Sequence, residues 1–190
     1  MGWNGKIIGG ALGLMFGGPV GALLGVLIGH QFDAQGIAPQ PGPGAAQRLQ
    51  ELFFPATFRV MGHVAKADGR VSEQEIAAAR AVMAALRLDP QQVQAAIGYF
   101  GEGKDPQFSL DAALAELRPL MRAFPQLAQF FLEIQLQASI AGNGLSELPR
   151  ARLARAAALF GFDATHLARL ESLMRWRMNG GAGMGAGGAA

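Results

Sequence analysis

The chain has 190 residues, enough for one membrane span and one domain of ordinary size. Its formal net charge of +2 is small and its basic residues are scattered, which argues against a nucleic-acid-binding protein. The lack of cysteine excludes disulfides, thiol chemistry, thiolate zinc sites and a lipidated-cysteine anchor, and it fits a cytoplasmic location for most of the chain.

A row of glycines at four-residue intervals opens the chain, along an apolar stretch, residues 7–32, without Asp, Glu, Lys or Arg. In water each glycine makes a helix about 1 kcal/mol less stable than alanine would. In a bilayer the backbone must bond within the segment, and small residues on one face let two helices pack closely. Residues 1–33 are therefore predicted to form a transmembrane segment that self-associates through a glycine stripe. The stripe comprises Gly9, Gly13, Gly17, Gly21, Gly25 and Gly29, with Gly5 before it.

The length of the apolar stretch supports a span. A helix over residues 7–29 would be roughly 35 Å long, against a hydrocarbon core of about 30 Å. A cleavable signal peptide fits less well, because its apolar region covers only about 7–15 residues and ends in a small-residue cleavage site. A glycine-zipper hairpin within an oligomer is a further alternative. Lys6 and Arg48 nearly balance across the span, so charge leaves its orientation open.

Two segments of low complexity flank a helical region. Residues 34–46 are rich in Pro and Gly and predict an extended linker, and residues 179–190 form a second linker of mostly Gly and Ala. Between them, residues 47–178 place apolar side chains at helical spacing. The predicted fold class is all-α, a transmembrane helix followed by a bundle of about seven helices. Those helices are expected near residues 48–67, 73–87, 90–100, 109–123, 126–141, 147–160 and 164–177.

Capping residues and a repeat organise this helical region. Ser72 and Glu75 predict a capping box, and later helix starts have the candidate caps Ser109, Ser146 and Asp163. Residues 101–104 are predicted to be a turn. A shift of 74 residues aligns the apolar pattern, the glycine turns and the acidic helix starts of two halves. The sequence therefore predicts two similar halves packed into one compact bundle.

The acidic residues around the first glycine turn are the candidate metal ligands. Asp68, Glu73 and Glu75 lie close in sequence, with His63 one helical turn earlier, and divalent cations prefer several carboxylate oxygens at a loop. The alternative is structural, because acidic residues also cap helices and favour their N-terminal ends. The repeat places Gly142 and Pro149 where Asp68 and Glu75 stand, so a paired metal site would lack its second half. No cofactor is predicted other than this candidate divalent metal.

No catalytic constellation accompanies these residues. His63 and His166 have no Ser, Cys or second His at catalytic spacing, and no Gly-rich loop is followed by Lys-Ser or Lys-Thr. The chain is therefore predicted not to be an enzyme. The last predicted helix carries Arg169, Arg175 and Arg177, which would face either solvent or an anionic surface such as lipid headgroups or an acidic partner.

Several motifs resemble the DjlA family, the membrane-anchored DnaJ-like co-chaperones of Gram-negative bacteria. The helical part is similar to the TerB-like domain, named from tellurite-resistance proteins. The matching motifs cover most of residues 5–178 and read GKIIG from Gly5, LIGH and FD from Leu27 to Asp33, LFF from Leu52, VMGH from Val60, GRV from Gly69 and FLEIQ from Phe131.

The resemblance implies a single span in the bacterial inner membrane, with a short periplasmic N-terminus and a cytoplasmic helical domain. It also implies a pairing span and a glycine-rich linker to a J-domain, whose His-Pro-Asp turn would stimulate ATP hydrolysis by DnaK. His-Pro-Asp does not occur in these 190 residues. The chain would then be a fragment, a truncated product, or an anchored TerB-like protein that works without a J-domain.

Two functions follow from these patterns. The first is a DjlA-like scaffold in the membrane, which dimerises through its span, presents the TerB-like domain to partners, and would work with DnaK only through a J-domain. The second is a metal-responsive tellurite-resistance or envelope-stress module, since TerB-like domains carry acidic residues at such turns and metal binding has been suggested for them.

Overall fold

The computed structural model describes residues 45–142 and 144–180, and the predicted span at 1–33 lies outside them. The described residues form eight α-helices and no strand, which confirms the all-α class for this part of the chain. None of these helices is both long and apolar enough to cross a membrane. The helices are α2 (Ala45–Ala65), α3 (Glu73–Ala85), α4 (Pro90–Gly103), α5 (Leu110–Ala115), α6 (Arg118–Ala123), α7 (Pro125–Ala141), α8 (Glu147–Phe160) and α9 (Ala164–Gly180).

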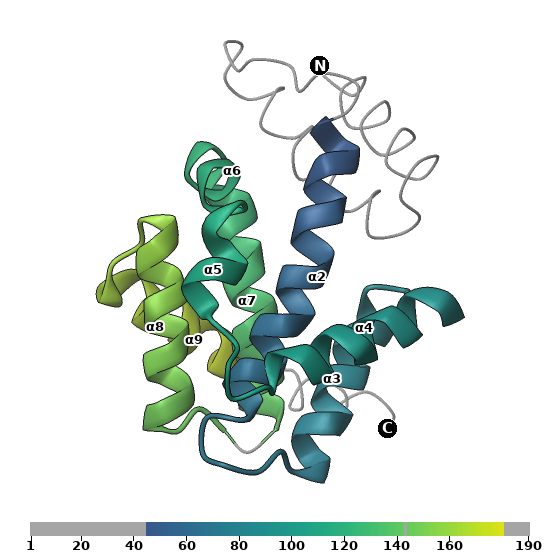
Figure 1. The fold of residues 1–190 in the computed structure, drawn as a ribbon. Coiled ribbons are helices and arrows are strands. Elements are labelled where there is room, and N and C mark those ends of the chain that lie inside the picture. The colour runs from purple at the N-terminus through teal and green to yellow at the C-terminus, as the bar shows by residue number, and fades with distance from the viewer. Residues whose placement is uncertain (1–44, 143, 181–190) are drawn as a thin grey trace, which may run out of the picture.

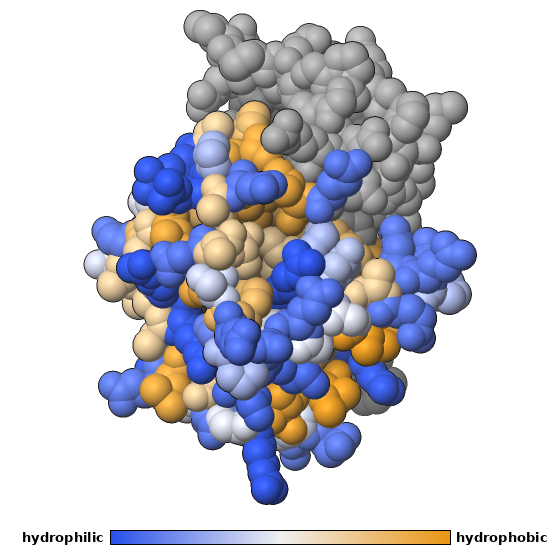
Figure 2. All heavy atoms as spheres, in the orientation of Figure 1, coloured by the Kyte–Doolittle hydropathy of each residue, from blue (hydrophilic) through white to orange (hydrophobic). Residues whose placement is uncertain are grey.

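Helices α2 and α7 run side by side through the middle of the bundle (Figure 1), with α3 and α4 on one side and α8 and α9 on the other. The core between them is aromatic and aliphatic. The Phe131 ring meets Phe53 and Phe160 edge to face, with ring centroids 5.6 and 5.4 Å apart. Hydrophilic side chains cover most of the face in Figure 2, where hydrophobic residues reach the surface in separate patches.

A buried polar contact ties the two central helices together. Gln135 of α7 is 1% exposed, and its Nε2 donates a hydrogen bond of 2.9 Å to the carbonyl oxygen of Thr57 in α2. The Thr57 hydroxyl donates in turn to the Phe53 carbonyl oxygen at 2.7 Å. Because buried polar groups are costly without partners, these bonds favour one register of α2 against α7.

The two halves of the domain follow the predicted repeat. The 74-residue shift carries the start of α3, Glu73, onto the start of α8, Glu147, and the start of α4, Pro90, onto the start of α9, Ala164. Helices α5 and α6 connect the halves. The same shift carries the start of α2, Ala45, to Pro119 in α6 and not to the start of α7, Pro125. The starts of the second and third helices of each half therefore agree with a domain built from α2–α3–α4 and α7–α8–α9, whereas the starts of the first helices do not.

Two glycines let α2 and α4 cross with their backbones in contact. A Cβ atom on Gly62 would lie 2.1 Å from the Phe100 carbonyl oxygen, and one on Gly103 would lie 1.8 Å from the Arg59 carbonyl oxygen. Both distances are far shorter than a van der Waals contact, so any larger residue would force the helices apart. The crossing thus depends on glycine at both positions.

Two details of the predicted helices are wrong. The single helix expected over residues 109–123 is two helices, α5 and α6, because Pro119 has no N–H to donate to the carbonyl of Ala115 and its ring crowds that carbonyl. The described count is therefore eight rather than seven. The turn expected at residues 101–104 begins later, since α4 continues to Gly103, where the contact with α2 offsets the low helix propensity of glycine. Helix α2 begins at Ala45, two residues inside the predicted linker, and α9 extends two residues into the second one.

Most predicted caps are confirmed. Ser72 and Glu75 form the capping box, and the Ser109 hydroxyl accepts from the Ala112 N–H. The Asp163 carboxylate accepts from the His166 N–H at 2.7 Å. Ser146 holds the N-cap position of α8 without a side-chain hydrogen bond, because the third residue of the helix is Pro149, which has no N–H.

Candidate functional site

The acidic turn between α2 and α3 contains the predicted metal ligands. Asp68 lies in the turn and is exposed, and Gly69 follows it with φ of 108°, a left-handed conformation that favours glycine. Glu73 is exposed at the first position of α3, whereas Glu75 is 9% exposed. The turn therefore directs two carboxylates to solvent and one toward the protein.

Glu75 is engaged by the helix that it caps. Its Oε2 accepts hydrogen bonds from the Ser72 N–H at 2.8 Å and from the Ser72 hydroxyl at 3.0 Å. The Ser72 Oγ accepts in turn from the Glu75 N–H at 3.2 Å. These bonds account for a nearly buried carboxylate by helix capping alone.

The described carboxylates and histidines do not gather into a metal-binding group. Within residues 45–142 and 144–180, no three His, Asp or Glu side chains are close enough together to hold an ion. Divalent cations require several oxygen ligands, and here one candidate ligand already serves as a cap. The metal site at Asp68, Glu73 and Glu75 therefore stays a prediction without a preformed ligand set.

An arginine from the other half of the domain lies beside this turn. Arg152 of α8 donates a hydrogen bond from Nη1 to the carbonyl oxygen of His63, near the end of α2. Burial lowers the pKa of Arg152, and the negative charge of Asp68 acts in the opposite direction. Asp68 thus has a protein cation nearby, which sequence reasoning missed because Arg152 stands 89 residues after His63.

His63 is a packed histidine. Its ring lies against Phe108, with ring centroids 5.1 Å apart. Burial lowers its pKa to about 4, and the positive charge of Arg152 adds to the effect. His63 is therefore neutral at pH 7. The second described histidine, His166, stacks on Phe162 with ring centroids 4.3 Å apart.

A small hollow lies next to the cap, lined by residues of α2, α3, α4, α7 and α8 and of the connection between α7 and α8. Its lining is mostly apolar and comprises Met61, Val64, Ala65, Glu75, Phe100, Ala138, Ser139, Gly144 and Pro149. Gly142, directly after α7, has no room for a side chain, since a Cβ there would lie 2.8 Å from the Glu75 Cγ. The repeat equivalent of Asp68 is therefore glycine because the buried Glu75 side chain occupies the space.

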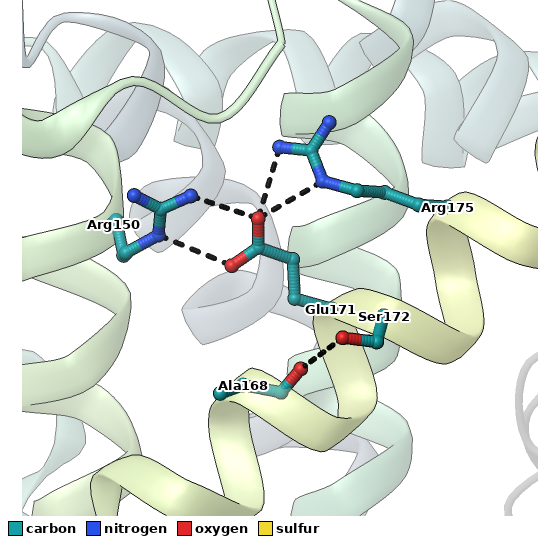
Figure 3. A network of polar contacts seen from close by, with 5 residues as sticks. All are labelled: Arg150, Ala168, Glu171, Ser172 and Arg175. Atoms are coloured by element: carbon teal, nitrogen blue, oxygen red, sulfur yellow. Dashed lines mark hydrogen bonds and ion pairs between the residues drawn. The ribbon is translucent and has the colours of Figure 1, made fainter.

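The arginines of the last helix differ from one another. Arg175 and Arg150 both bind Glu171 (Figure 3), with Arg175 Nη2 and Arg150 Nη2 2.9 and 2.8 Å from Glu171 Oε1. These two hydrogen-bonded arginines lower the pKa of Glu171. Arg169 and Arg177 are exposed. The Glu171–Arg175 pair has the four-residue spacing of neighbours on one helix, whereas the Arg150–Glu171 pair joins two helices and could not be predicted from the charge pattern.

The comparisons with protein families cover both parts of the chain. Residues 1–48 match the model described as the co-chaperone DjlA transmembrane domain, which contains the predicted glycine stripe. Residues 55–172 match the model described as tellurite resistance protein TerB, which corresponds to most of the helical domain. The first match supports a membrane-anchored protein. The glycines themselves, Gly9 to Gly29, lie outside the described residues.

The relatives with curated names are co-chaperones. The chain is 47% identical over 173 residues to co-chaperone protein DjlA from Coxiella burnetii, covering 86% of this chain and 64% of that protein. It is 41% identical over 143 residues to DjlA from Legionella pneumophila, covering 72% and 48%. It is 45% identical over 143 residues to DjlA from Yersinia pestis, covering 74% of this chain and 52% of that protein. No solved structure matches.

The chain spans about half to two thirds of the length of these relatives. Two family regions follow each other within it, the transmembrane domain ending at residue 48 and the TerB region starting at residue 55. The chain belongs to the TerB family and, with a DjlA-type transmembrane domain before its TerB region, is a relative of co-chaperone DjlA.

Proposed function

We propose that this chain is the membrane-anchored scaffold of a DjlA-type co-chaperone, a non-enzymatic protein whose TerB domain binds partners beside the bilayer. The observation that carries the proposal is the direct succession of a DjlA transmembrane domain and a TerB domain in one chain. The described histidines of the TerB domain pack against phenylalanine rings and Glu75 of its acidic turn caps a helix, so these residues have structural roles, which agrees with a non-enzymatic protein.

The span is proposed to cross the inner membrane once and to leave the helical domain in the cytoplasm. A fluorescent protein fused after residue 190 should then fluoresce, and alkaline phosphatase fused at the same point should be inactive. The reverse pattern would contradict the orientation while leaving the anchor itself unaffected.

The glycine stripe is proposed to pair two copies of the span. Replacing Gly17 by leucine should abolish the signal of a membrane two-hybrid assay, because the larger side chain separates the helix backbones. Gly18→Leu is a matched control, since Gly18 is adjacent but lies about 100° away around the helix. Equal signals from the two variants would contradict pairing through the stripe.

Stimulation of DnaK is proposed to belong to a J-domain, as in the family that the chain resembles. Residues 1–190 contain no His-Pro-Asp sequence, so this polypeptide alone should not raise the ATPase rate of DnaK. A fusion that adds a J-domain after residue 190 should raise it. Stimulation by the unfused polypeptide would contradict this division of roles.

The metal-responsive function is the second candidate and depends on two exposed carboxylates, Asp68 and Glu73, at one turn. Titration calorimetry of the detergent-solubilised chain with calcium, magnesium, manganese and zinc tests it. Heat that is lost in the Asp68→Asn and Glu73→Gln double variant would support a metal site. Absence of heat with all four ions would leave only the scaffold.

A further inference from the structure

The charge of the described domain is unevenly distributed. Residues 147–180, which form α8 and α9, contain six arginines and three acidic residues, a net charge of +3. Residues 45–146 contain nine basic and ten acidic residues, a net charge of −1. The basic character of the domain is therefore concentrated in its last two helices.

Exposed large apolar side chains are concentrated in the same place. Of the five in the described part of the chain, four belong to the first turn of α8 or the C-terminal half of α9. Trp176 is 73% exposed, Leu148 57% and Leu173 45%, and Met178 is the fourth. Because a protein gains stability by burying such side chains, their clustering on one hairpin indicates a contact surface.

The outer face of α9 combines both properties. Arg169, Leu173 and Trp176 follow a helical spacing of four and three residues, so they share one exposed face. The helix is held in the core by Leu167 and Leu170 on its other side. The single carboxylate of α9, Glu171, is neutralised by Arg150 and Arg175 (Figure 3), which leaves the outer face positively charged.

We infer that this face of α9, with Arg169, Leu173, Trp176 and Arg177, docks onto the anionic surface of the membrane that anchors the chain. Tryptophan favours the bilayer interface, and arginine is attracted to anionic headgroups. The inference rests on the membrane anchor of the proposed function and assigns a second contact with the same bilayer.

The attachment of the domain to its membrane anchor explains how so small a patch can be sufficient for docking onto the bilayer. The predicted span ends at residue 33 and α2 begins at Ala45, so residues 34–44 join the domain to the anchor. Docking is then intramolecular, and a weak surface attraction acts at a high effective concentration. An acidic protein partner would have no such advantage, and for this reason the observations favour the lipid surface.

Trp176 fluorescence in the full chain tests the inference. Only two tryptophans are present, so Trp3→Phe makes Trp176 the only reporter. The variant is reconstituted into vesicles of phosphatidylcholine alone or of phosphatidylcholine mixed with phosphatidylglycerol. In the mixed vesicles Trp176 emission should shift to shorter wavelength and be quenched by brominated lipid. Arg169→Gln and Arg177→Gln should each lower the docked-to-undocked ratio about fivefold, whereas the exposed Arg80→Gln should not.

Trp176 that stays accessible to water in mixed vesicles would overturn the inference. Equal quenching in both lipids would also overturn it, because it would indicate lipid contact without selection of anionic headgroups. A shift to shorter wavelength without quenching would indicate self-association instead and would likewise overturn it. Flotation of the chain with the neutral vesicles is measured first. Failure to float would contradict the anchor, whereas flotation without Trp176 quenching would contradict only the docking.

Discussion

The two halves of the TerB domain share a plan and differ in how their third helix packs. In the first half α4 crosses α2 through Gly62 and Gly103, and Arg59 and Glu102 form an ion pair beside the crossing at 2.6 Å. The 74-residue shift carries the two glycines to Leu136 and Arg177, and it carries the pair to Glu133 and Trp176. The second half therefore lacks both glycines of the close α2–α4 contact and both residues of the ion pair beside it.

The difference separates stability from surface function. Leu136 is fully buried, so α7 keeps its place in the core, whereas Arg177 and Trp176 are exposed on α9. Backbone contact of the kind seen between α2 and α4 requires glycine at both contact positions, and the second half has glycine at neither of the equivalent positions. The first half is thus fixed by close packing, and the second half presents the outer face of its last helix.

The largest expected effect is at the first crossing. Gly62→Ala and Gly103→Ala should each destabilise the domain by about 3 kcal/mol or more, because the new methyl group would overlap a backbone carbonyl. Gly101→Ala is the matched control, since it is on the same helix and has no atom within 4 Å of its Cβ position. It should be neutral or more stable by up to about 1 kcal/mol. Chemical unfolding followed by circular dichroism measures all three, and equal losses would contradict the close crossing.

The capping difference between the halves gives the next effect. Ser72→Ala should cost about 1 kcal/mol, because it removes the side-chain acceptor for the Glu75 N–H. Ser146→Ala should change the unfolding free energy by less than about 0.5 kcal/mol, because Pro149 leaves that serine without a side-chain bond. Urea unfolding of the two variants compares them directly. A loss at Ser146 as large as that at Ser72 would refute the assigned role of Pro149.

A smaller effect concerns the ends of α3 and α8. Arg87 has φ of 52° and its repeat equivalent Gly161 has φ of 96°, so both adopt the left-handed conformation that ends a helix. Arg87→Gly should stabilise the domain by at most about 1 kcal/mol, and Gly161→Ala should destabilise it by a similar amount. Thermal melts of the two variants test whether their effects have opposite signs.

The smallest effect at neutral pH involves His63, whose repeat equivalent is Gln137. Burial and Arg152 lower the folded-state pKa of His63 to about 4, below the value of 6.5 expected when unfolded. The unfolded chain therefore binds a proton first, and the stability that the neutral ring contributes is present above pH 6.5 and lost as pH falls toward 4. His63→Gln should reduce this loss of stability in acid unfolding and leave the free energy of unfolding at pH 7 nearly unchanged. An NMR titration with a normal His63 pKa would contradict the account.

Local signals predicted much of this domain. The Ser72 box, the Asp163 cap and the 74-residue repeat depend on neighbouring residues or on periodicity, both of which can be found in sequence. Pro119 also indicates a helix break from sequence alone, although the single helix predicted over residues 109–123 ignored it. The close contact at Gly62, the Arg152 bond to His63 and the ion pair of Glu171 with Arg150 join distant segments, so they required the fold.

The candidate site shows the same division. The sequence shows three carboxylates close to one turn, but their roles depend on the residues that the fold brings next to them. Glu75 caps α3 and lies beside Gly142, and the charge of Asp68 affects the pKa of Arg152. The Arg-rich last helix and the four-residue spacing of Glu171 and Arg175 were visible in sequence, but the second partner of Glu171, Arg150, depends on the packing of α8 against α9.

Anchoring is tested most directly by membrane fractionation of the complete 190-residue chain. After cell lysis without detergent, the chain should sediment with membranes, resist carbonate extraction and float with lipid on a density gradient. A variant beginning at residue 45 should lose this resistance to carbonate. Recovery of the complete chain in the soluble fraction would contradict a membrane-anchored TerB protein, however well the helical domain itself folds.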